Sequence, residues 1–248
     1  MSDANKSLSR GLRILRTFNQ HSRPSLAQLS AAADIPKPTA LRYLQTLIDE
    51  GYVALDTATK RYSLRPRVVD LGMAALGSLG VPRQMESEIE RLAVVSGGSA
   101  HLGVLDGTDV IIVARNVAPA ERRRFVTMQL YVGSRLPAHC SALGRILLAN
   151  APEAAAEAIK PENIVRLTPL TETDPARIAN IVTQARSDGY ATIEEELALG
   201  YCAIAIRLGT FDKIDYALSI SMPSNEFNKH DLVERMLPLL LETTKHRN

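Results

Sequence analysis

The first regular pattern of apolar residues lies close to the amino end of the chain. Four apolar side chains there recur at i, i+4, i+7 and i+10, which is the spacing of one face of an amphipathic helix. Polar residues and Pro24 then break the pattern, so the helix is expected to end before them. The residues predicted for its buried face are Leu8, Leu12, Leu15 and Phe18.

A second short helix is expected to begin after Ser25. The segment Ser25-Leu26-Ala27-Gln28 has the form of a capping box, in which the serine hydroxyl accepts from a first-turn amide and the glutamine reaches back to the serine amide. This helix is predicted to continue to about Ala33, and Asp34-Ile35-Pro36 then forms a turn. The pattern therefore places a tight turn between this helix and the next.

A third helix is predicted to run from about Pro38 to Gly51. Proline in a first helical turn gives up no hydrogen bond, and glycine commonly ends a helix. Leu41, Leu44 and Ile48 form its expected buried stripe. Three short helices with a tight turn between the second and the third are what a helix-turn-helix requires, and its last helix enters the DNA major groove.

Two short strands are predicted after the third helix. Residues 52–55 and 61–64 read as strands, and the polar segment 56–60 between them ends in a lysine. This pattern is typical of a hairpin with a cationic tip, which makes the head a winged helix-turn-helix. The alternative interpretation is a three-helix packing module with a solvated polar face.

Charge separates the head from the rest of the chain. Residues 1–65 carry ten Lys/Arg and five Asp/Glu, a net charge of +5, whereas the remainder carries nineteen and twenty-two, a net charge of −3. A basic head favours a polyanionic partner, so we predict that it binds double-stranded operator DNA through phosphates and base edges. The residues expected to contact DNA are Ser25, Lys37, Pro38, Thr39, Arg42, Tyr43, Thr46, Lys60 and Arg61.

The apolar stretch after the head is expected to be a linker helix. Residues 66–80 are rich in Leu, Ala, Met and Val, and the pattern is compatible with packing on another chain or on the body of the same chain. A further helix is predicted from Pro82 to about Val95. The predicted division is a winged helix-turn-helix at 1–65, a linker helix at 66–80 and a larger domain at 81–248.

The remaining sequence alternates strand-like and helical segments. Asp106-Gly107 is a hairpin turn signal, and Asp174-Pro175 is a helix-start signal followed by apolar residues up to Gly189. Hairpins interleaved with helices predict an α+β domain. Strands are expected at 100–105, 110–115, 124–131, 203–208 and 215–221, and helices at 140–149, 153–159, 174–189 and from about 231.

Composition indicates the cellular setting. The first six residues contain no apolar segment of a secretion signal, and no apolar run approaches the roughly 20 residues that span a bilayer. Cys140 and Cys202 are the only cysteines, which is too few for a disulfide framework. We therefore expect a cytoplasmic protein that does not enter a membrane.

Several segments resemble the IclR family of bacterial regulators. The segment Val132 to Arg145 is similar to the family's most specific motif, whereas Pro38 stands where the family usually has serine. The resemblance covers nearly the whole chain, and it implies a GAF-like effector domain with an antiparallel sheet. It also implies homodimers through heads and linkers, with pairs of dimers common. The matching segments are 7–15, 25–29, 35–44, 132–145, 168–171, 189–191, 194–196 and 217–221.

The resemblance further implies an effector cup for a small organic acid. In the family, backbone amides hold a carboxylate where the His-x-Ser-x-x-Gly segment enters its helix, and such helix ends suit anions. Strand hydroxyls complete the site, and Ser219 and Ser221, two apart on a predicted strand, share one face. The positions that we assign to the effector are Met128, His139, Ser141, Ala142, Leu143, Ala203, Ser219, Ser221, Arg123 and Arg124.

Two departures from the family pattern concern the chemistry of the cup. Ile193 stands in place of an acidic contact, and Ala203 in place of a cysteine, of the members that sense glyoxylate and pyruvate. Both changes make the cup more apolar, which favours an aromatic ligand. Segments 114–116 and 122–135 resemble the branch that controls aromatic-acid catabolism through protocatechuate and 4-hydroxybenzoate. The arginines at 122–124 either pair with the ligand carboxylate or remain a solvated charge run.

The sequence carries no signature of an enzyme. His139-Cys140-Ser141 places an imidazole beside a thiol, but catalytic pairs normally meet through the fold, and nucleophile elbows, phosphate loops and dinucleotide fingerprints are absent. Together with His101 and Cys202, these residues also lack metal-ligand spacing. We therefore expect no catalysis, cofactor or metal. The remaining alternative is a DNA-binding protein whose larger domain serves only for oligomerisation.

Overall fold

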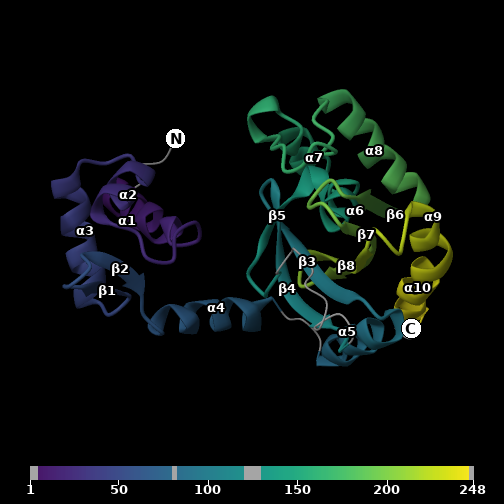
Figure 1. Ribbon diagram of the computed structural model, residues 1–248, viewed down its shortest axis with the longest axis horizontal. Helices are drawn as coiled ribbons and strands as arrows, with labels where there is room; N and C mark the ends of the chain where they lie inside the picture. The colour runs from purple at the N-terminus through teal and green to yellow at the C-terminus, as the bar shows by residue number, and fades with distance from the viewer. Residues whose placement is uncertain (1–4, 80–82, 120–129, 246–248) are drawn as a thin grey trace. The chain divides into compact units, whose positions relative to one another are not determined.

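The computed structural model describes residues 5–79, 83–119 and 130–245 (Figure 1). The chain divides into two compact units, Met1–Ser78 and Leu79–Asn248. We call the first the head and the second the sensor domain. The head contains α1 (Lys6–Thr17), α2 (Leu26–Ala32), α3 (Lys37–Asp49), β1 (Val53–Asp56), β2 (Arg61–Leu64) and α4 (Arg67–Ser78).

The head has the helix-turn-helix arrangement that the sequence predicts. Ser25 and Gln28 form the expected capping box at the start of α2. Gly51, with a φ of 77°, follows α3 in the left-handed conformation that glycine adopts without strain. β1 and β2 pair antiparallel, with Val53 opposite Leu64. The core shared by the helices and the hairpin is Ile14, Phe18, Leu29, Ala33, Ile35, Ala40, Leu44, Val53 and Tyr62.

The predicted buried stripe of the first helix is wrong over its first two turns. Leu8 and Leu12 are 62% and 47% exposed, whereas Ile14 and Thr17 are buried. α2 and α3 pack against the face that carries Ile14, Thr17 and Phe18, and Leu8 and Leu12 lie on another face of the same helix. α1 therefore has two apolar faces, and the described residues cover only one of them.

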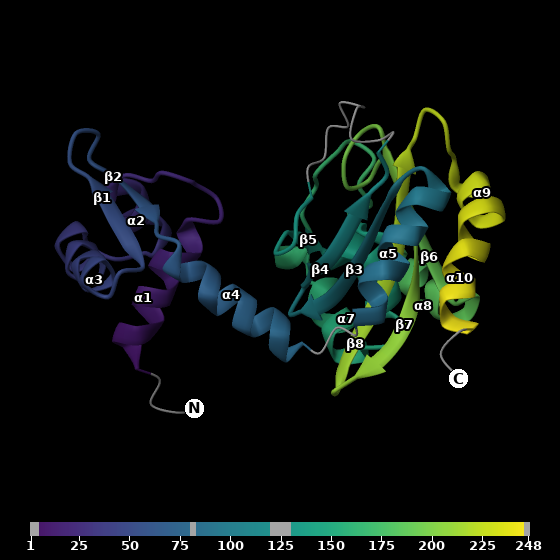
Figure 2. The same ribbon diagram turned by 90° about the horizontal axis from the view of Figure 1, so that it is seen from below.

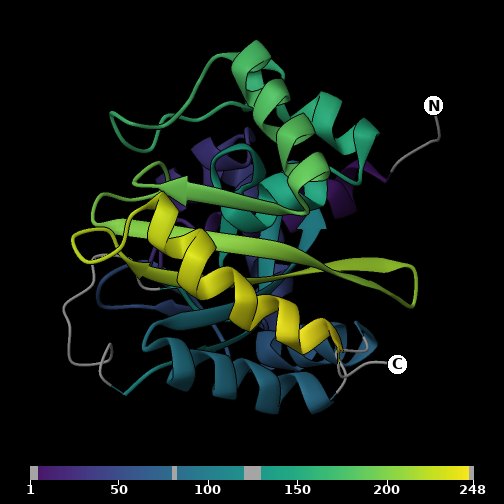
Figure 3. The same ribbon diagram turned by 90° about the vertical axis from the view of Figure 1, so that its right-hand side faces the viewer.

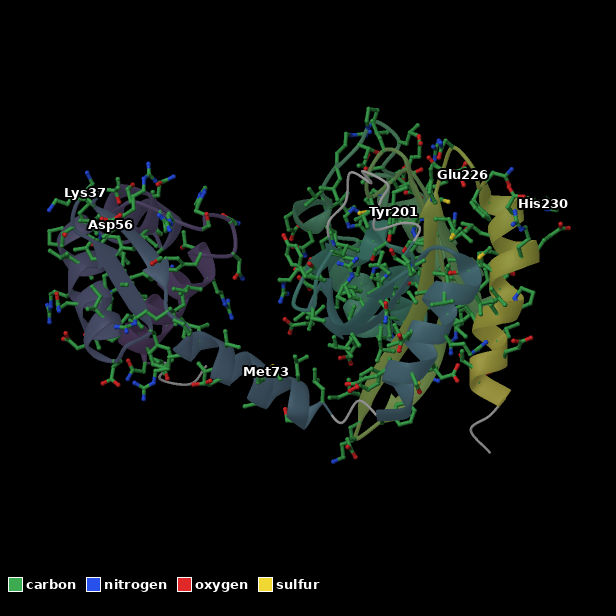
Figure 4. The ribbon with its side chains drawn as sticks, turned by 60° about the horizontal axis from the view of Figure 1, so that its bottom comes forward. Lys37, Asp56, Met73, Tyr201, Glu226 and His230 are labelled. Carbon is green, nitrogen blue, oxygen red and sulfur yellow. The ribbon has the colours of Figure 1, made fainter. Side chains whose placement is uncertain are left out.

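Exposed apolar side chains also occur on α3 and α4. Leu41, predicted to be buried, is 49% exposed, because α3 packs through Ala40 and Leu44 instead. α4 has no buried residue, and Val69, Leu71 and Met73 (Figure 4) are all more than half exposed. Apolar surface that a chain leaves uncovered often marks a binding surface.

The sensor domain has the predicted α+β class, with helices on both faces of an antiparallel sheet (Figure 2). The order of its six strands is β5-β4-β3-β8-β7-β6. The elements are α5 (Arg83–Ser96), β3 (Ser99–Asp106), β4 (Asp109–Val117), β5 (Arg135–Pro137), α6 (Ala142–Leu148), α7 (Pro152–Ala158), α8 (Pro175–Asp188), β6 (Tyr190–Glu194), β7 (Tyr201–Phe211), β8 (Ile214–Pro223), α9 (Lys229–Asp231), a π-helical turn (Leu232–Met236) and α10 (Leu237–Lys245).

The sequence did not predict the two edge strands, β5 and β6. β5 spans three residues and β6 five, which is too short for alternation to stand out from loop sequence. A strand was expected at 124–131, but residues 124–129 lie outside the described residues, and Leu130 and Tyr131 are not in a strand. Sequence patterns therefore located the central strands and missed the sheet edges.

Each face of the sheet is covered by its own helices. α5 and α10 contact each other and lie in front of the sheet in Figure 3. α6 packs on the opposite face, against strands β3, β6, β7 and β8. Because side chains alternate along a strand, His101, Ala203 and Ser219 face α6, whereas Leu102 and Leu218 face the other way. The candidate effector residues Ala203 and Ser219 thus lie between the sheet and α6.

Candidate functional site

The recognition helix α3 presents a polar surface on the head. Lys37 (Figure 4), Pro38, Arg42 and Thr46 are exposed, and Thr39 is half-buried. The Thr46 hydroxyl donates to the carbonyl of Arg42 at 3.2 Å, so it is used within the helix. The Arg42 guanidinium bonds to none of the described residues, which leaves it able to reach a base edge.

Tyr43 is turned toward α1 rather than outward. It is half-buried, and a hydrogen bond with Ser7 lowers the pKa of its hydroxyl, with a further lowering from Arg10. Ser7 and Arg10 both belong to α1. The Tyr43 hydroxyl therefore links α3 to α1.

The hairpin tip carries the two cations predicted for the wing. Lys60 and Arg61 are exposed, and the Asp56 carboxylate accepts two backbone amides of the tip at 2.9 and 3.2 Å. The Arg61 guanidinium donates to the carbonyl of Arg23 at 2.8 Å. Arg61 thus fixes the hairpin against the segment before α2, whereas the Lys60 ammonium bonds to none of the described residues.

Ser25 has a structural use, and two exposed residues of α3 were missed. The Ser25 amide donates to the Gln28 side chain at 2.9 Å, and its hydroxyl accepts the Gln28 amide at 3.4 Å. Leu41 and Gln45 are exposed on α3, one residue before and three residues after Arg42. The i+3 spacing from Arg42 could have identified Gln45. No sequence signal distinguished Leu41 from a core leucine.

A cavity lies between the sheet and the start of α6. Its volume is about 240 Å³, including space that opens to solvent. Most of its lining is apolar, with a histidine, a tyrosine and two serines as its polar groups. The lining residues are His101, Leu130, Leu136, Ser141, Ala142, Leu143, Ile193, Leu197, Tyr201, Ala203 and Ser219.

The cavity brings together half of the residues that the sequence assigns to the effector, and other assigned positions lie elsewhere. Ser221 and His139 are buried but not in the cavity lining, and His139 Nε2 lies 3.1 Å from the carbonyl oxygen of Val165. Arg123, Arg124 and Met128 fall outside the described residues. The assigned positions that line the cavity are Ser141, Ala142, Leu143, Ala203 and Ser219.

The start of α6 is held tightly by its own sequence. Ser141 is the N-cap, and its hydroxyl accepts the Gly144 amide at 3.1 Å. A Cβ at Gly144 would lie 2.2 Å from the carbonyl oxygen of Ala138, so glycine allows the helix to pack on the turn before it. The first amides of α6, at Ala142 and Leu143, have no partner within the helix and border the cavity.

Three buried polar side chains form a hydrogen-bonded chain beside the cavity. The Tyr201 and Ser221 hydroxyl oxygens lie 2.7 Å apart, and Ser221 Oγ lies 3.3 Å from His101 Nδ1. Burial, with the charge of Arg115, lowers the pKa of His101 to about 3, so this imidazole is neutral at physiological pH. Ser219 is 2% exposed, and its hydroxyl bonds to none of the described residues.

A buried ion pair holds the wall of the cavity. The Arg145 side chain is 2% exposed, and its two terminal nitrogens donate to the two carboxylate oxygens of Glu196, each at 2.6 Å. Arg145 also donates to the carbonyls of His139 and Thr192 at 2.9 and 3.1 Å. Four of the five N–H groups of this guanidinium are therefore used in joining α6 to β6 and the segment after it, and Arg145 does not line the cavity. The sequence analysis missed this pair because 51 residues separate its members.

The two cysteines are buried thiols rather than nucleophiles. Burial raises the pKa of Cys140 and of Cys202 to about 12. Cys202 donates to the carbonyls of Met222 and Phe227, on the side of β7 away from Ala203, as expected for adjacent strand residues. Among residues 5–79, 83–119 and 130–245, no cluster of three His, Cys, Asp or Glu side chains could hold a metal ion.

Comparison with known proteins supports the assignment of both units. The description "IclR helix-turn-helix domain" matches residues 7–57, and "Bacterial transcriptional regulator IclR C-terminal" matches residues 73–246. The Pca regulon regulatory protein of Pseudomonas putida is 31% identical over 242 residues, which cover 96% of this chain and 81% of that protein. The p-hydroxybenzoate hydroxylase transcriptional activator of Acinetobacter baylyi is 30% identical over 240 residues, with coverages of 95% and 88%.

The fold is also similar to solved structures. A crystal structure of an IclR homolog complexed with 4-hydroxybenzoate, from Microbacterium hydrocarbonoxydans, has a TM-score of 0.76, 25% identity and coverage of 96% of each chain. The matching families and relatives are transcriptional regulators, not enzymes. In the part of the chain that the structure describes, no helix is long and apolar enough to cross a membrane. The chain is a DNA-binding transcriptional regulator of the IclR family.

Proposed function

We propose that a monocyclic aromatic acid, bound in the cavity between the sheet and α6, controls the DNA binding of this regulator. The observation that carries the proposal is an apolar cavity lined by the buried Ser219, whose hydroxyl bonds to none of the described residues. Ile193 and Ala203 contribute apolar surface for a ring. Ser219 and the first amides of α6 supply hydrogen bonds for a carboxylate.

The size of the cavity agrees with a small ligand. Its empty space of about 240 Å³ includes space open to solvent, so the cavity is too small for a nucleotide and limits the effector to a small molecule. One relative is a p-hydroxybenzoate hydroxylase transcriptional activator, and one similar structure holds 4-hydroxybenzoate. These relatives support an aromatic acid as the class of effector.

The proposed division of labour follows the two units. Residues 1–65 bind operator DNA through Arg42, Lys37 and Lys60, residues 66–80 join the domains, and residues 81–248 bind the effector. Because the protein would bind both genomic operator DNA and an acid from catabolism, we propose that it acts in the cytoplasm.

We propose in addition that the protein acts as a homodimer. Leu8 and Leu12 on α1 and Leu71 and Met73 on α4 are 47–62% exposed, and none of the described residues covers them. Two copies that bury these faces would remove apolar area from water, at about 25 cal/mol per Å². A two-fold dimer would present two recognition helices to a palindromic operator.

Thermal unfolding of the full chain with a panel of acids tests the effector proposal. Benzoate, 4-hydroxybenzoate or protocatechuate should raise the Tm saturably, because ligand at a hundred times its Kd adds about 2.7 kcal/mol to the free energy of unfolding. Pyruvate and glyoxylate should have smaller effects, since they leave the apolar walls unfilled. If no acid shifts the Tm, the larger domain is an oligomerisation module and the proposal is wrong.

Ser219→Ala locates the site within this test. The substitution should weaken binding of the acid about ten- to a hundredfold, because a hydrogen bond to a charged group is lost. Ser187→Ala, at an exposed serine of α8, is the matched control and should leave affinity unchanged. Equal affinities for all three proteins would place the acid outside the cavity.

A further inference from the structure

We propose that the outer edge of β6 is a docking site, at which an extended, lysine- or arginine-rich segment of a partner protein adds to the sheet as a further strand. The inference goes beyond the proposed function and does not depend on the identity of the effector. Ile193 lines both the effector cavity and this docking site, on its two sides.

β6 is an edge strand with one open side. It lies at one end of the sheet and pairs only with β7 among the described strands. The Glu195 amide donates to the Tyr201 carbonyl at 2.7 Å, and hydrogen-bonded pairs alternate along an antiparallel ladder. The amide of Ile193 therefore points to β7, whereas that of Thr192 points away from it. Arg145 donates to the Thr192 carbonyl at 3.1 Å from that outer side, and the oxygen keeps a second lone pair.

The two edges of the sheet differ in their protection against strand addition. Natural edge strands are protected by shortness, proline, basic side chains or bulges. β5, at the other end of the sheet, has three residues and includes Arg135 and Pro137. β6 has five residues, contains no proline, lysine or arginine, and keeps a continuous register with β7 from Tyr190 to Glu194. β6 is therefore the edge that can accept another strand.

A groove follows this open edge. β6 lies beside α8 (Figure 1), and every residue of β6 lines a groove with a volume of about 550 Å³. Leu170, Ile181 and Ala185 give the groove apolar surface, and the Leu170 side chain is 56% exposed. The volume lies within the range of roughly 300–1,000 Å³ that is typical of ligand sites. The groove therefore has room for the side chains of an added strand.

The charge of the groove favours a basic occupant. Its lining includes five carboxylates and two cations, a net charge of −3 for the described residues. One of the two cations, Arg145, is already bound to Glu196. Asp188 and Glu194 are exposed, and neither forms an ion pair with a described residue. The carboxylates are those of Glu172, Asp188, Glu194, Glu195 and Glu196, and the cations are Arg145 and Lys229.

The same charge disfavours a second copy of this chain at the edge. Two-fold pairing of β6 with β6 of another copy would bring two acidic grooves together, and like charges on neighbouring strands are destabilising. A basic strand would instead place its cations beside Asp188 and Glu194. In strand addition the main-chain hydrogen bonds supply affinity, and the side chains, here cationic ones, supply specificity.

Fluorescence anisotropy of labelled synthetic peptides, titrated with the full-length protein at physiological salt, tests the docking site. The first probe is a heptapeptide of alternating lysine and valine. The second has glutamate in place of each lysine, and the third is the lysine peptide with a methyl group on every backbone nitrogen. We expect saturable binding of the first probe and at least about tenfold weaker binding of the other two, because they lack the cations or the strand donors. Absence of binding by the first probe, or equal binding of the methylated one, would overturn the inference.

Charge-reversal variants assign the binding to this edge. Asp188→Lys with Glu194→Lys should weaken binding of the lysine peptide about tenfold and strengthen binding of the glutamate peptide, because attractions become repulsions and the reverse. Glu153→Lys with Glu162→Lys is the matched control, since both carboxylates are exposed and lie outside the groove lining. Equal effects of the two double variants would refute the assignment to β6. A change of oligomeric state in sedimentation velocity, with peptide binding unchanged, would show that a second copy occupies the edge and would also refute it.

Discussion

The head and the sensor domain depart from the simple rule of apolar inside and polar outside in opposite ways. The head leaves Leu8, Leu12 and Leu41 exposed on helices that also contribute to its core. The sensor domain buries His101, Ser219 and Ser221 between a sheet and a helix. Exposed apolar groups and buried polar groups are the informative exceptions to that rule. We propose that in this protein the first kind marks contacts with other macromolecules, and the second a small-molecule site.

The exposed apolar residues of the head and the buried polar residues of the sensor domain also differ in their effect on stability. Removing an exposed leucine from the head leaves the core of one chain intact. Removing a hydrogen-bonded buried group from the sensor domain, such as the Ser221 hydroxyl, leaves its partners buried and unsatisfied. Substitutions in the head should therefore change association with little effect on folding, whereas buried polar substitutions in the sensor domain should change folding as well as ligand binding.

The largest expected effect comes from breaking the buried ion pair. Arg145→Ala leaves Glu196 without its cation, which should lower the free energy of unfolding by about 3–5 kcal/mol. Urea denaturation measures this loss. Arg135→Ala is the control, because Arg135 bonds to Asp106 and Asp109 with a side chain that is 42% exposed, and it should cost less than about 1 kcal/mol. Equal costs would mean that burial does not distinguish the two arginines.

The next effect concerns the uncovered face of α1. Leu8→Asp with Leu12→Asp should shift a dimer toward monomers by at least about a hundredfold in dissociation constant, because each change removes apolar contact worth about 1.5–3 kcal/mol. Sedimentation velocity measures the shift. Far-UV circular dichroism and the urea midpoint at low protein concentration should match those of wild-type monomer. A loss of helix content instead would show that this face belongs to the fold of a single head.

The next effect is smaller, and it concerns recognition of the operator DNA sequence by the head. Arg42→Ala should lower affinity for a selected operator by about 1–3 kcal/mol, because a bidentate contact with a base edge is lost. Fluorescence anisotropy with operator and random duplexes measures the change. Gln45→Ala, on the same exposed face, provides a comparison. Equal losses on both duplexes would assign Arg42 to the phosphate backbone.

A smaller effect should appear in the pH dependence of stability. The pKa of His101 is about 3 in the folded chain and near 6.5 when unfolded, so below pH 6.5 the unfolded state binds the extra proton. The stability from the neutral imidazole is complete above pH 6.5 and decreases as pH falls, by up to about 1.4 kcal/mol per pH unit. Urea melts at pH 7 and pH 5.5 should show a shallower decrease for His101→Gln than for wild type. Identical slopes would contradict a buried, neutral His101.

Local signals in the sequence predicted much of this fold. The capping box at Ser25 and Gln28 and the helix capped by Asp174 and Gly189 are present as expected. Caps and turns depend on residues within a few positions, so one sequence is enough to identify them. Leu8 and Leu41 were placed wrongly because a hydrophobic period locates an apolar face without saying whether the same chain or another molecule covers it.

The candidate cavity was less predictable because its parts come together through the fold. His101, Ser221 and Tyr201 meet from three strands, and 120 residues separate the first two. His101 was considered only as a metal ligand, and Tyr201 was not considered at all. The resemblance to a family identified Ser219 and Ser221 as a pair. Only the hydrogen bonds in the structure distinguish them: the Ser221 hydroxyl bonds to Tyr201, whereas the Ser219 hydroxyl bonds to none of the described residues.

The most direct test of the central claim is whether the acid and the DNA affect each other's binding. Anisotropy titrations with a selected operator duplex should be carried out with and without saturating 4-hydroxybenzoate, for wild type and Ser219→Ala. The account predicts that the acid changes operator affinity of wild type by about 5- to 150-fold, and that operator changes the affinity for the acid by the same factor. Ser219→Ala should lose this change at the same acid concentration. Operator affinity that is independent of every acid that binds the protein would contradict the claim that this cavity controls DNA binding.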